Sequence, residues 1–562
     1  MFSLKQTWAT RNIGDYALLE LLDENVHVAA NKYWKVTPNS GVVSSAIGAA
    51  AADSSIKTLI FFQTIKNAVS AKGKVSKSLK PVKIPLRDDE RAWLEITTLE
   101  MGGEEHIYLD IEEGSLTSPS VVHHGLLLPE ERQLCESLYL RPDGATVMTA
   151  TSTVAQGMNF PSEFVIIAED SRFDEAKNKR EVLEAQELLN AAGRAGRAGH
   201  NANGTVLVIP GRVVPIDFED ATIGNHWATL QKVFGQSDQC LDIDDPLTAI
   251  LDRVHANVDL KGDIDRYAVA RLATPNADGD PAAQLRSTLS KSLATFRAKK
   301  NNQDDWVQSR IAAAVKFQKG QSPESEEELS ELQVASTLGI PLTVVSRLSK
   351  DLALEDVAAN TSVPTWRRWF FGWISANPDL FDQIFRPDTM NDLLGKGLEA
   401  IEEEKARAKF AIPHLKELTK LWMAGKPLKD LQAVLGTPMQ NLKTCIDARK
   451  FVIRVVPELA FLFGIPALLR QRRNAAAGDK VELQPALAHL GRCVRQGFKN
   501  HEQAALNQHL RSARLSRRQL HLRYALIEPY LGAASDGETW DDAVIRVAAA
   551  VEAELDERAE DI

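Results

Sequence analysis

The chain has 562 residues, of which 44% are hydrophobic and 25% charged, and its formal net charge is −10. This length predicts roughly three to four domains of ordinary size, and the composition is typical of a globular protein rather than a disordered one. The acidic balance excludes a uniformly basic surface but leaves room for a local basic channel, because contacts follow the local field.

Cysteine usage and hydropathy exclude further classes. The four cysteines are far apart and form no C-x-x-C pair, so neither a zinc site nor a disulfide framework is indicated. The N-terminus lacks the apolar core of a signal peptide, and no apolar stretch approaches the roughly 18 residues of a membrane span. We therefore expect a cytoplasmic protein with no membrane contact and no bound structural metal.

The first predicted elements are an extended segment and a buried strand. Residues 25–38 (NVHVAANKYWKVTP) look extended, and residues 57–64 (KTLIFFQT) form an apolar strand that ends in Gln63 and Thr64. A helix follows that strand, and residues 80–111 are then expected to be an extra extended excursion.

A turn and an amphipathic helix follow at residues 123–139 (HHGLLLPEERQLCESLY), with Gly125 in the turn and Pro129 in the first helical turn. No cysteine or carboxylate stands at ligand spacing from His123 and His124, so we expect these two side chains to pack or cap the helix rather than bind metal.

Two apolar runs, residues 145–148 and 164–168, predict strands of a buried parallel sheet. The loop between them, residues 149–159, offers the Thr151 hydroxyl, a flexible Gly157 and a polar Asn159. Such groups suit contact with phosphates and a nucleotide sugar at the carboxyl ends of strands, where α/β sheets bind ligands.

Residues 190–199 (NAAGRAGRAG) place Arg194 and Arg197 three apart, each directly after a glycine. On a helical turn this spacing puts both guanidinium groups on one side. A permanently charged, planar group can neutralise the charge that develops on a transferring phosphoryl group. The alternative interpretation is a basic surface turn. Residues 204–211 (GTVLVIPG) then predict another buried strand.

In this order, LIFFQT, HHGLLLPEER, ATSTVAQGMNFP and GRAGR resemble motifs IV, IVa, V and VI of superfamily 2 helicases, in wording closest to the Ski-like branch that includes archaeal repair helicases. The resemblance covers residues 57–210. It implies an α/β RecA-like domain over residues 46–212, a parallel sheet with helices on both faces, preceded by an inter-lobe segment over residues 1–45.

The resemblance also assigns roles. Arg194 and Arg197 would be arginine fingers on the γ-phosphate of ATP. The groups that contact the nucleotide would be Gly157, Asn159, Asn190 and Gly193, and those that grip the backbone of one nucleic-acid strand would be Gln63, Thr64, Gly125 and Thr151. The family usually has Gln where this chain has Asn190, which shortens the reach of that side chain to the phosphates.

The first RecA-like lobe of such a helicase is not found. The sequence contains neither a P-loop nor a DExH-type box, and the stretch before residue 57 is too short for a domain of roughly 100 residues. ATP and Mg²⁺ would be held mainly by that lobe. We expect a separate polypeptide to supply it, with truncation as the alternative, and we expect this chain to be inactive alone.

Beyond residue 212 the pattern is mostly α-helical, with a helical connection over residues 213–330. Residues 331–450 include a helix-turn-helix-like stretch, 332–352, that is compatible with a winged helix. The segment WRRWFFGW (366–373) is expected to form core, and the helical pattern of 415–435 is interrupted at residues 425–427.

Residues 451–562 are expected to form a helical, basic, nucleic-acid-binding region with an acidic tail. Between residues 470 and 523 there are twelve Lys or Arg and three Asp or Glu, which indicates a groove for a polyanion that includes Arg492 and Arg495. This run is similar to the helical bundle of the Ski-like branch, in which one long helix serves as a ratchet. A merely solvated face is the alternative.

These features predict the C-terminal motor half of an ATP-dependent helicase or translocase that acts on single-stranded nucleic acid. DNA is favoured over RNA because the helical pattern is nearer that of the repair helicases and because no RNA-binding insert follows the RecA-like lobe. The alternative is a non-catalytic nucleic-acid-binding or scaffold protein that has kept the helicase fold.

Overall fold

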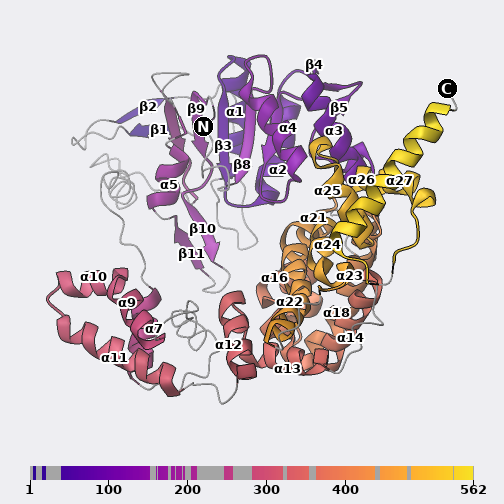
Figure 1. The fold of residues 1–562 in the computed structure, drawn as a ribbon. Coiled ribbons are helices and arrows are strands. Elements are labelled where there is room, and N and C mark those ends of the chain that lie inside the picture. The colour runs from indigo at the N-terminus through magenta and orange to yellow at the C-terminus, as the bar shows by residue number, and fades with distance from the viewer. Residues whose placement is uncertain are drawn as a thin grey trace. The chain divides into compact units, whose positions relative to one another are not determined.

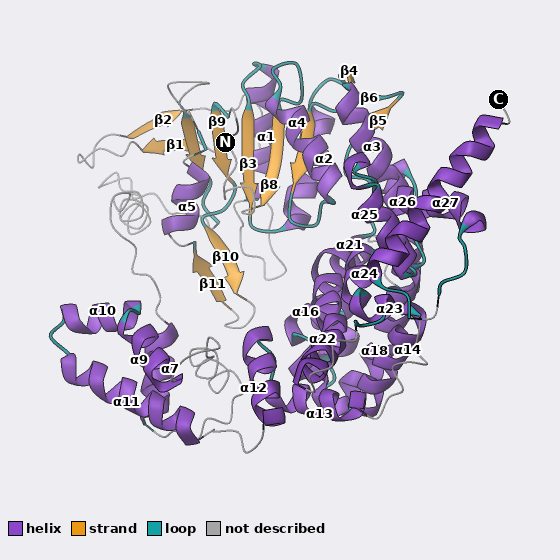
Figure 2. Ribbon diagram, viewed as in Figure 1, coloured by secondary structure: helices purple, strands orange, loops and turns teal. Residues whose placement is uncertain are grey.

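The computed structural model describes residues 4–7, 16–19, 39–151, 160, 162–174, 179–183, 185–192, 194–195, 204–211, 246–256, 281–320, 326–353, 362–436, 443–476, 482–535 and 537–560. These residues fall into two compact units, the first comprising Met1–Leu241 with Lys443–Cys445 and the second comprising Asp242–Leu442 with Ile446–Ile562. The first contains all the described strands and the second is helical (Figures 1 and 2).

The centre of the first unit is a five-stranded sheet in the order β12-β9-β3-β8-β7, in which every neighbouring pair is parallel. Its middle strands are buried on both faces, as their continuous apolar runs predict. The strands are β3 (Thr58–Phe62), β7 (Ser120–His123), β8 (Val147–Thr151), β9 (Phe164–Ile167) and β12 (Thr205–Val208).

Four helices pack on this sheet. Helix α1 packs on α2 and on β3, α4 packs on β7, and α5 packs on β9. A Cβ atom at Gly48 of α1 would lie 2.5 Å from Cδ1 of Ile60, so the absence of a side chain there allows the close approach. The helices are α1 (Ser40–Asp53), α2 (Ile65–Ser78), α4 (Pro129–Leu140) and α5 (Ala185–Ala192). The α/β class and parallel sheet predicted from the sequence are confirmed.

The expectation that residues 80–111 form an extended excursion was wrong. The segment contains helix α3 (Asp88–Met101) and the short 3-10 helix η1 (Glu104–His106), and a small antiparallel sheet in the order β4-β6-β5 adjoins it. Three acidic residues open α3, where the helix dipole favours them, and the Arg87 N–H donates to Glu90 Oε2 at 2.9 Å. The small strands are β4 (Ile84–Pro85), β5 (Ile111–Glu112) and β6 (Ser115–Leu116).

Smaller differences concern boundaries. Strand β8 extends to Thr151, so the residues expected to begin the following loop complete the strand instead. Helix α1 begins at Ser40, inside the inter-lobe segment expected over residues 1–45, while the stretch expected to be extended, residues 25–38, lies outside the described residues. Two antiparallel strand pairs complete the unit: β1 (Leu4–Thr7) with β2 (Tyr16–Leu19), and β10 (Ser171–Asp174) with β11 (Lys179–Val182).

The second unit begins with a small helical group that has its own core. Helices α7 and α9 both pack on α11, and α10 packs on α9 and α11. Leu251, Leu285 and Leu289 are buried at the centre of this core, and the Trp306 side chain packs against it. The helices are α7 (Pro246–His255), α9 (Pro281–Ser290), α10 (Leu293–Lys300) and α11 (Asp304–Gly320).

The remainder of the second unit is a larger helical array. Its helices are α12 (Glu326–Leu338), α13 (Leu342–Ala353), α14 (Val363–Ala376), η3 (Pro378–Leu380), α15 (Phe381–Ile384), α16 (Pro387–Leu394), α17 (Lys396–Glu399), α18 (Glu404–Met423), α19 (Leu428–Val434), α21 (Ile446–Lys450), η4 (Phe451–Val455), α22 (Val456–Ala476), α23 (Pro485–Ala488), α24 (Leu490–Gln496), α25 (His501–His509), η5 (Arg511–Ala513), α26 (Arg517–Ile527), η6 (Glu528–Tyr530) and α27 (Trp540–Glu560). The expected interruption at residues 425–427 falls between α18 and α19, where Gly425 has a φ of 73°.

The aromatic segment of α14 forms core, as expected. Trp366, Phe370 and Phe371 are almost fully buried, and the Phe370 and Phe463 ring centroids lie 4.3 Å apart. Aromatic side chains bury large apolar areas, so this cluster joins α14 to the long helix α22.

The expectation that no apolar stretch is long enough to cross a membrane was wrong. Residues 446–475 form continuous helix, including a π-helical turn at η4, and an 18-residue window within them has a mean hydropathy of 1.9. Half of that window is buried inside the protein, where α22 packs on α24, α12 and α13. Length and composition alone are weak evidence for a span, because the core helix of a helical array has the same properties.

Candidate nucleic-acid and nucleotide sites

Gln63 and Thr64 lie where β3 ends and α2 begins. The Thr64 hydroxyl accepts a hydrogen bond from the Asn67 N–H at 3.2 Å and so caps the helix. Gln63 Nε2 donates to the carbonyl oxygen of Glu169 at 3.4 Å, which directs this side chain toward the loop after β9. Because a helix N-terminus presents free N–H groups and a positive dipole end, this junction suits an anion such as a backbone phosphate.

Gly125 lies in the turn after β7, next to two buried histidines. His123 Nε2 contacts Glu136 Oε1 of α4 at 2.7 Å, and His124 Nδ1 accepts from the Leu126 N–H at 3.2 Å. The His124 ring also meets the Tyr108 ring edge-on, with centroids 4.7 Å apart. Both imidazoles thus pack and hold the turn, as expected.

Thr151 is the last residue of β8 and is only 7% exposed. Its register partner on β3 is Phe62, directly before Gln63, and His123 pairs in register with Ala150. Neighbouring strands lie about 4.8 Å apart, so Gln63, Thr64, Gly125 and Thr151 all lie at the carboxyl edge of the sheet. The structure therefore brings together the four residues predicted to grip a strand. Gly157 and Asn159 lie outside the described residues.

Arg194 lies at the other end of β9. It follows α5, and its neighbour Ala195 forms a parallel bridge with Ser162, two residues before β9 begins. Arg194 is 4% exposed, whereas Asn190, in the last turn of α5, is exposed. The predicted strand-gripping residues and Arg194 therefore lie at opposite edges of the sheet. From the sequence, the phosphate and nucleotide-sugar contacts of residues 149–159 were expected at the carboxyl edge, and Arg194 was assigned to neither edge. Gly193 and Arg197 lie outside the described residues.

The structure identifies two further positioning residues that the sequence did not single out. Glu169 holds groups at the carboxyl edge, and Lys57 holds the chain just before β3. Glu169 Oε1 accepts from the Ser40 hydroxyl at 2.7 Å, and its carbonyl accepts from Gln63. Lys57 Nζ donates to the carbonyl oxygens of Tyr139, Arg141 and Ala145 at 2.5, 2.7 and 3.0 Å. Burial lowers the pKa of Lys57 to about 8, and the nearby Asp143 opposes this shift. The sequence signal that could have identified Lys57 is its position directly before an apolar strand.

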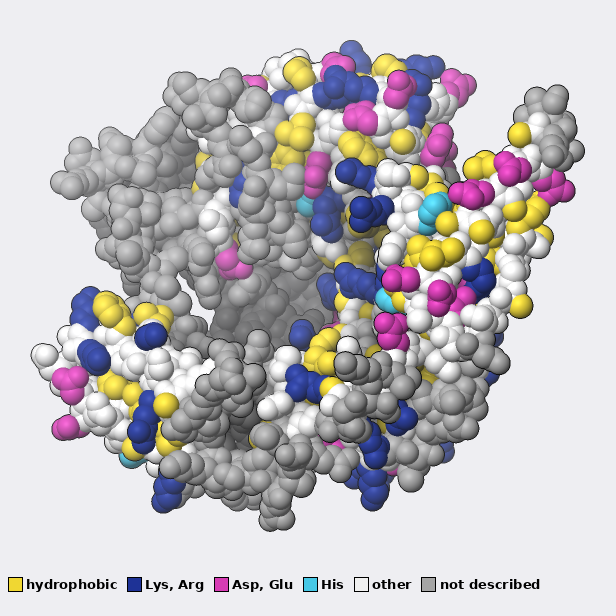
Figure 3. Space-filling view, viewed as in Figure 1, with side chains coloured by type: hydrophobic (Ala, Val, Ile, Leu, Met, Phe, Trp, Pro, Cys, Tyr) yellow, Lys and Arg dark blue, Asp and Glu magenta, His cyan; other side chains and the backbone are white. Residues whose placement is uncertain are grey.

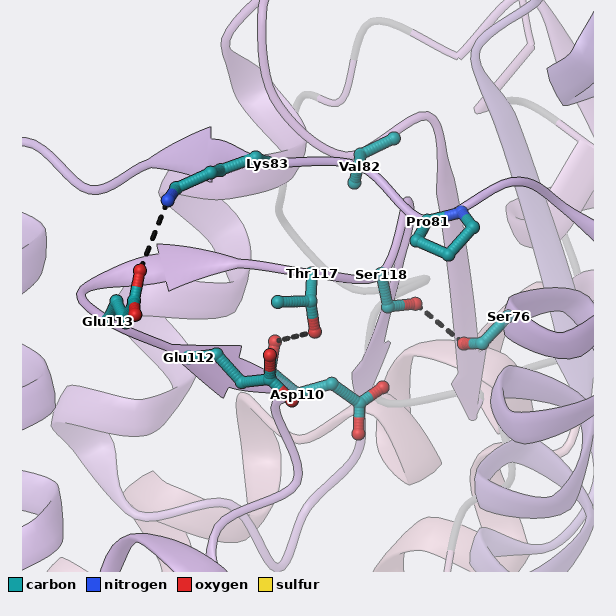
Figure 4. Close-up of a pocket in the computed structure, with 9 residues that line it drawn as sticks. All are labelled: Ser76, Pro81, Val82, Lys83, Asp110, Glu112, Glu113, Thr117 and Ser118. Atoms are coloured by element: carbon teal, nitrogen blue, oxygen red, sulfur yellow. Dashed lines mark hydrogen bonds and ion pairs between the residues drawn. The ribbon is translucent and has the colours of Figure 1, made fainter.

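A cavity of about 530 Å³ has none of these motif residues in its lining (Figure 4). It lies beside the small antiparallel sheet, where Asp110, Glu112 and Glu113 line it together with hydroxyl groups and Lys83. Lys83 Nζ lies 3.2 Å from Glu113 Oε2. An acidic lining disfavours phosphate, so this cavity is unsuited to ATP or a nucleic-acid backbone.

The basic residues of the C-terminal region divide into two groups. Arg517 is 9% exposed, donates to the carbonyls of Trp422 and Lys426 at 2.7 and 2.8 Å, and stacks on the Trp422 ring at 4.1 Å. Arg492 donates to Gln496 and Gln508 and lies over the Trp540 ring. Arg495 is exposed at the end of α24, as are Lys499, Arg511 and Arg514 nearby in sequence. The predicted residue Arg492 thus joins helices, while Arg495 faces solvent.

The acidic tail forms α27 and pairs with part of this basic region. Arg523 Nη2 lies 2.7 Å from Glu554 Oε2, and Arg546 joins Glu538 and Glu502 at 2.6 and 3.2 Å. The tail is therefore in part a packed helix, and it neutralises Arg523.

The helix-turn-helix-like pattern corresponds to α12 and α13, which pack on each other. On the polar face of α13, Arg347 Nη1 lies 2.9 Å from Asp379 Oδ2, and the Thr343 hydroxyl donates to Gln383 at 3.0 Å. Within the described residues of the second unit there is no strand that could serve as a wing. Two polar side chains of α13 thus make contacts with the segment after α14, and both contacts are exposed to solvent.

Comparisons with known proteins place a segment of the chain among helicases. The antiviral helicase SKI2 of Saccharomyces cerevisiae is 40% identical over 88 residues, 16% of this chain and 7% of that protein. The ATP-dependent DNA helicase homolog MER3 of Arabidopsis thaliana is 33% identical over 90 residues, 16% and 8% of the two chains. The activating signal cointegrator 1 complex subunit 3 of Rattus norvegicus is 30% identical over 127 residues, 22% and 6%. No protein-family model matches. The matches span less than a tenth of the length of these relatives.

Proposed function

Because this chain is related to superfamily 2 helicases of the Ski-like branch, we propose that it is the C-terminal motor half of an ATP-dependent helicase or translocase that acts on single-stranded nucleic acid, with DNA favoured. The observation that best supports the proposal is the gathering of Gln63, Thr64, Gly125 and Thr151 at one edge of the sheet.

The carboxyl edge would bind the strand. The N-terminus of α2 offers unpaired N–H groups to a phosphate, and the exposed Lys66 in its first turn adds a positive charge. A backbone phosphate there would lie beside Gln63, whose amide is held by the Glu169 carbonyl. Contacts of this kind read the backbone and not the bases, so they suit movement along a strand.

The ATP site would lie at the opposite edge, near Arg194. The 562 residues contain no P-loop and no DExH-type box, so the phosphates and Mg²⁺ need a RecA-like lobe from outside this sequence, in our proposal a second polypeptide. Arg194 and Arg197 would then act as arginine fingers on the γ-phosphate when the lobes close, with Gly157, Asn159, Asn190 and Gly193 next to the nucleotide. The separation of the two edges lets hydrolysis at one alter the grip at the other.

The burial of Arg194 favours a second candidate function. A guanidinium that is 4% exposed reaches no external nucleotide unless the segment after α5 moves. A non-catalytic nucleic-acid-binding protein that has kept the helicase fold would have no need for such movement.

The test is ATP hydrolysis by the chain alone, and mixed with the product of a neighbouring gene that encodes a P-loop and a DExH-type box, with oligo(dT) present. We expect activity only in the mixture, a loss of about 10³-fold or more with Arg197→Ala, and little recovery with Arg197→Lys. If no mixture hydrolyses ATP while oligo(dT) still binds, the binding-protein alternative replaces the motor.

A further inference from the structure

We propose that α9 and α10 form a second binding surface for single-stranded nucleic acid, with Phe296 as a base-stacking side chain between lysines. This surface lies outside the helicase-like motifs and does not depend on ATP hydrolysis. We call it the α9–α10 surface. Its members are Arg286, Lys291, Leu293, Phe296, Lys299 and Lys300.

The helix α10 has two unlike faces. Its buried residues are small, Ala294, Thr295 and Ala298, and they pack it closely on α9 and α11. Ser292 caps the helix by accepting from the Thr295 N–H at 3.2 Å, and the Thr295 hydroxyl donates to the Leu289 carbonyl at 2.7 Å. These contacts fix the rotation of α10, and with it the direction of its outer face.

The outer face presents an aromatic ring to solvent. Phe296 is 63% exposed and Leu293, one turn earlier, is 39% exposed. Lys299 and Lys300, one turn later, are exposed as well, and the spacing of three and four residues puts them on the same side of the helix as Phe296. In the space-filling view, basic and hydrophobic side chains lie next to each other over α10 (Figure 3).

The charge of this segment is unlike that of the whole chain. Residues 281–303 contain five Lys or Arg and no Asp or Glu, in a protein of net charge −10. Among the described residues, no ion pair joins Lys291, Lys299 or Lys300 to a carboxylate. Cations in the last turn of a helix interact favourably with its dipole, but that effect does not explain an exposed phenylalanine between them.

A single strand is the occupant that fits both features. Proteins that bind single strands without sequence preference combine cations, which contact the phosphates, with aromatic side chains on which bases stack. An anionic lipid surface would also attract the lysines. Interfacial helices, however, bury a long apolar face, and the two turns of α10 expose only Leu293 and Phe296.

Photo-crosslinking tests the placement directly. The full chain with p-benzoylphenylalanine at position 296 is irradiated with labelled oligo(dT), and a crosslinked product is expected. The matched control has the same group at Ala312, an exposed position on α11 outside the α9–α10 surface, where no crosslink is expected. Equal crosslinking at both positions, or none at 296, overturns the proposal.

Affinity variants test the two parts of the surface separately. Phe296→Ala should weaken oligo(dT) binding about five-fold or more, and Phe296→Trp should retain it, because any aromatic ring can stack. Lys299→Glu with Lys300→Glu should weaken binding and lower its salt dependence. Because Phe296 is mostly exposed, the melting temperature should not change. An unchanged affinity in Phe296→Ala, or in the Lys299→Glu with Lys300→Glu variant, contradicts the proposal.

Two further readouts separate this proposal from its rivals. Phosphatidylserine vesicles replace the oligonucleotide in a sedimentation assay. If Phe296→Ala abolishes vesicle binding and leaves oligo(dT) binding intact, the surface is a membrane contact. The ATPase of the mixture described above reports on the motor alone, so a positive crosslink without ATPase would retain this surface and reject the motor.

Discussion

The two units use polar side chains in different ways. In the sheet-containing unit, parallel topology gathers Gln63, Thr64, Gly125 and Thr151 at one edge, although they are far apart in sequence. In the helical unit, arginines that are close in sequence are dispersed, and several are buried to join helices. Topology therefore locates a candidate site in the first unit, whereas counting charges in the second overstates the surface available to phosphate.

Arg407 illustrates the internal use of charge. It is 7% exposed and donates to Asp382, to Asn391 and to the carbonyls of Leu398 and Ile401. One guanidinium group thus joins α18 to the residues just before it and to the helices α15 and α16. Such a residue is indistinguishable in sequence from a phosphate-binding arginine, so only the structure can assign its role.

The largest effect on stability should come from the aromatic core of the helical unit. Trp366→Ala removes a fully buried indole and should lower the free energy of unfolding by about 3–5 kcal/mol. Phe461→Ala, at a 43% exposed position of α22, is the control and should cost less than about 1 kcal/mol. Urea titration followed by circular dichroism measures both. Equal losses would mean that the WRRWFFGW segment is not core.

A buried arginine should come next. Arg517→Ala leaves the Trp422 and Lys426 carbonyls without their donor and removes the stacking on Trp422, so we expect a loss of about 3 kcal/mol. Arg517→Lys should restore part of it, because an ammonium can reach one carbonyl. If Arg517→Ala left the urea midpoint unchanged but weakened oligo(dT) binding, Arg517 would belong to the exposed group instead.

These cases show which parts of the molecule the sequence could predict. Strands β3, β8 and β9 contain apolar runs, which are the signature of buried parallel strands, so both the sheet and the gathering of motif residues at its edge followed. The expectation that residues 204–211 form a buried strand was wrong in part, because β12 is the edge strand of the sheet and its first two residues are exposed. The sequence signal that could have identified helix α3 is its acidic first turn, Asp88, Asp89 and Glu90, in which the buried Glu90 side chain accepts from the Arg87 N–H.

The candidate site was predictable only where topology decides it. The burial of Arg194 and its place at the amino edge depend on how α5 returns along β9, and no local pattern encodes that path. The exposed ring of Phe296 was missed for a related reason. A phenylalanine at helical spacing usually faces a core, and only the packing of Ala294 and Ala298 turns it outward.

Acid should destabilise the helical unit through His489. Burial, with Arg492 and His501 nearby, lowers the pKa of His489 to about 4 from an ordinary 6.5. Above pH 6.5 the imidazole is neutral in both states. As the pH falls from 6.5 toward 4, the unfolded chain takes up a proton that the folded chain does not, so stability is lost in this window. His489→Phe, which retains a ring against Trp540, should flatten the fall in urea midpoint between pH 7 and 5. An unchanged pH profile in this variant would contradict the prediction.

A smaller effect should distinguish stability from binding at the sheet edge. Thr64→Ala removes the cap of α2 and should cost about 1 kcal/mol, whereas Thr64→Ser should cost little. If the carboxyl edge binds a strand, Thr64→Ala should also weaken oligo(dT) binding measured by fluorescence anisotropy, and Lys66→Ala should do so without loss of stability. Oligo(dT) binding that is indifferent to both variants would remove the edge from the proposed interface.

The smallest effect on stability is expected at Arg495, and this variant best separates exposed arginines from those that are paired within the protein. This side chain is exposed, so Arg495→Ala should change the free energy of unfolding by less than about 0.5 kcal/mol. If Arg495 contacts one phosphate, the slope of log affinity against log salt should fall by about 0.7. Arg523→Ala is the matched control, because Arg523 is paired with Glu554 at 2.7 Å. It should leave the salt slope unchanged while lowering stability. In the opposite outcome, Arg523→Ala alters the salt slope and Arg495→Ala does not. That result would mean that nucleic acid displaces α27 from Arg523, and that the acidic tail shields the strand-binding surface.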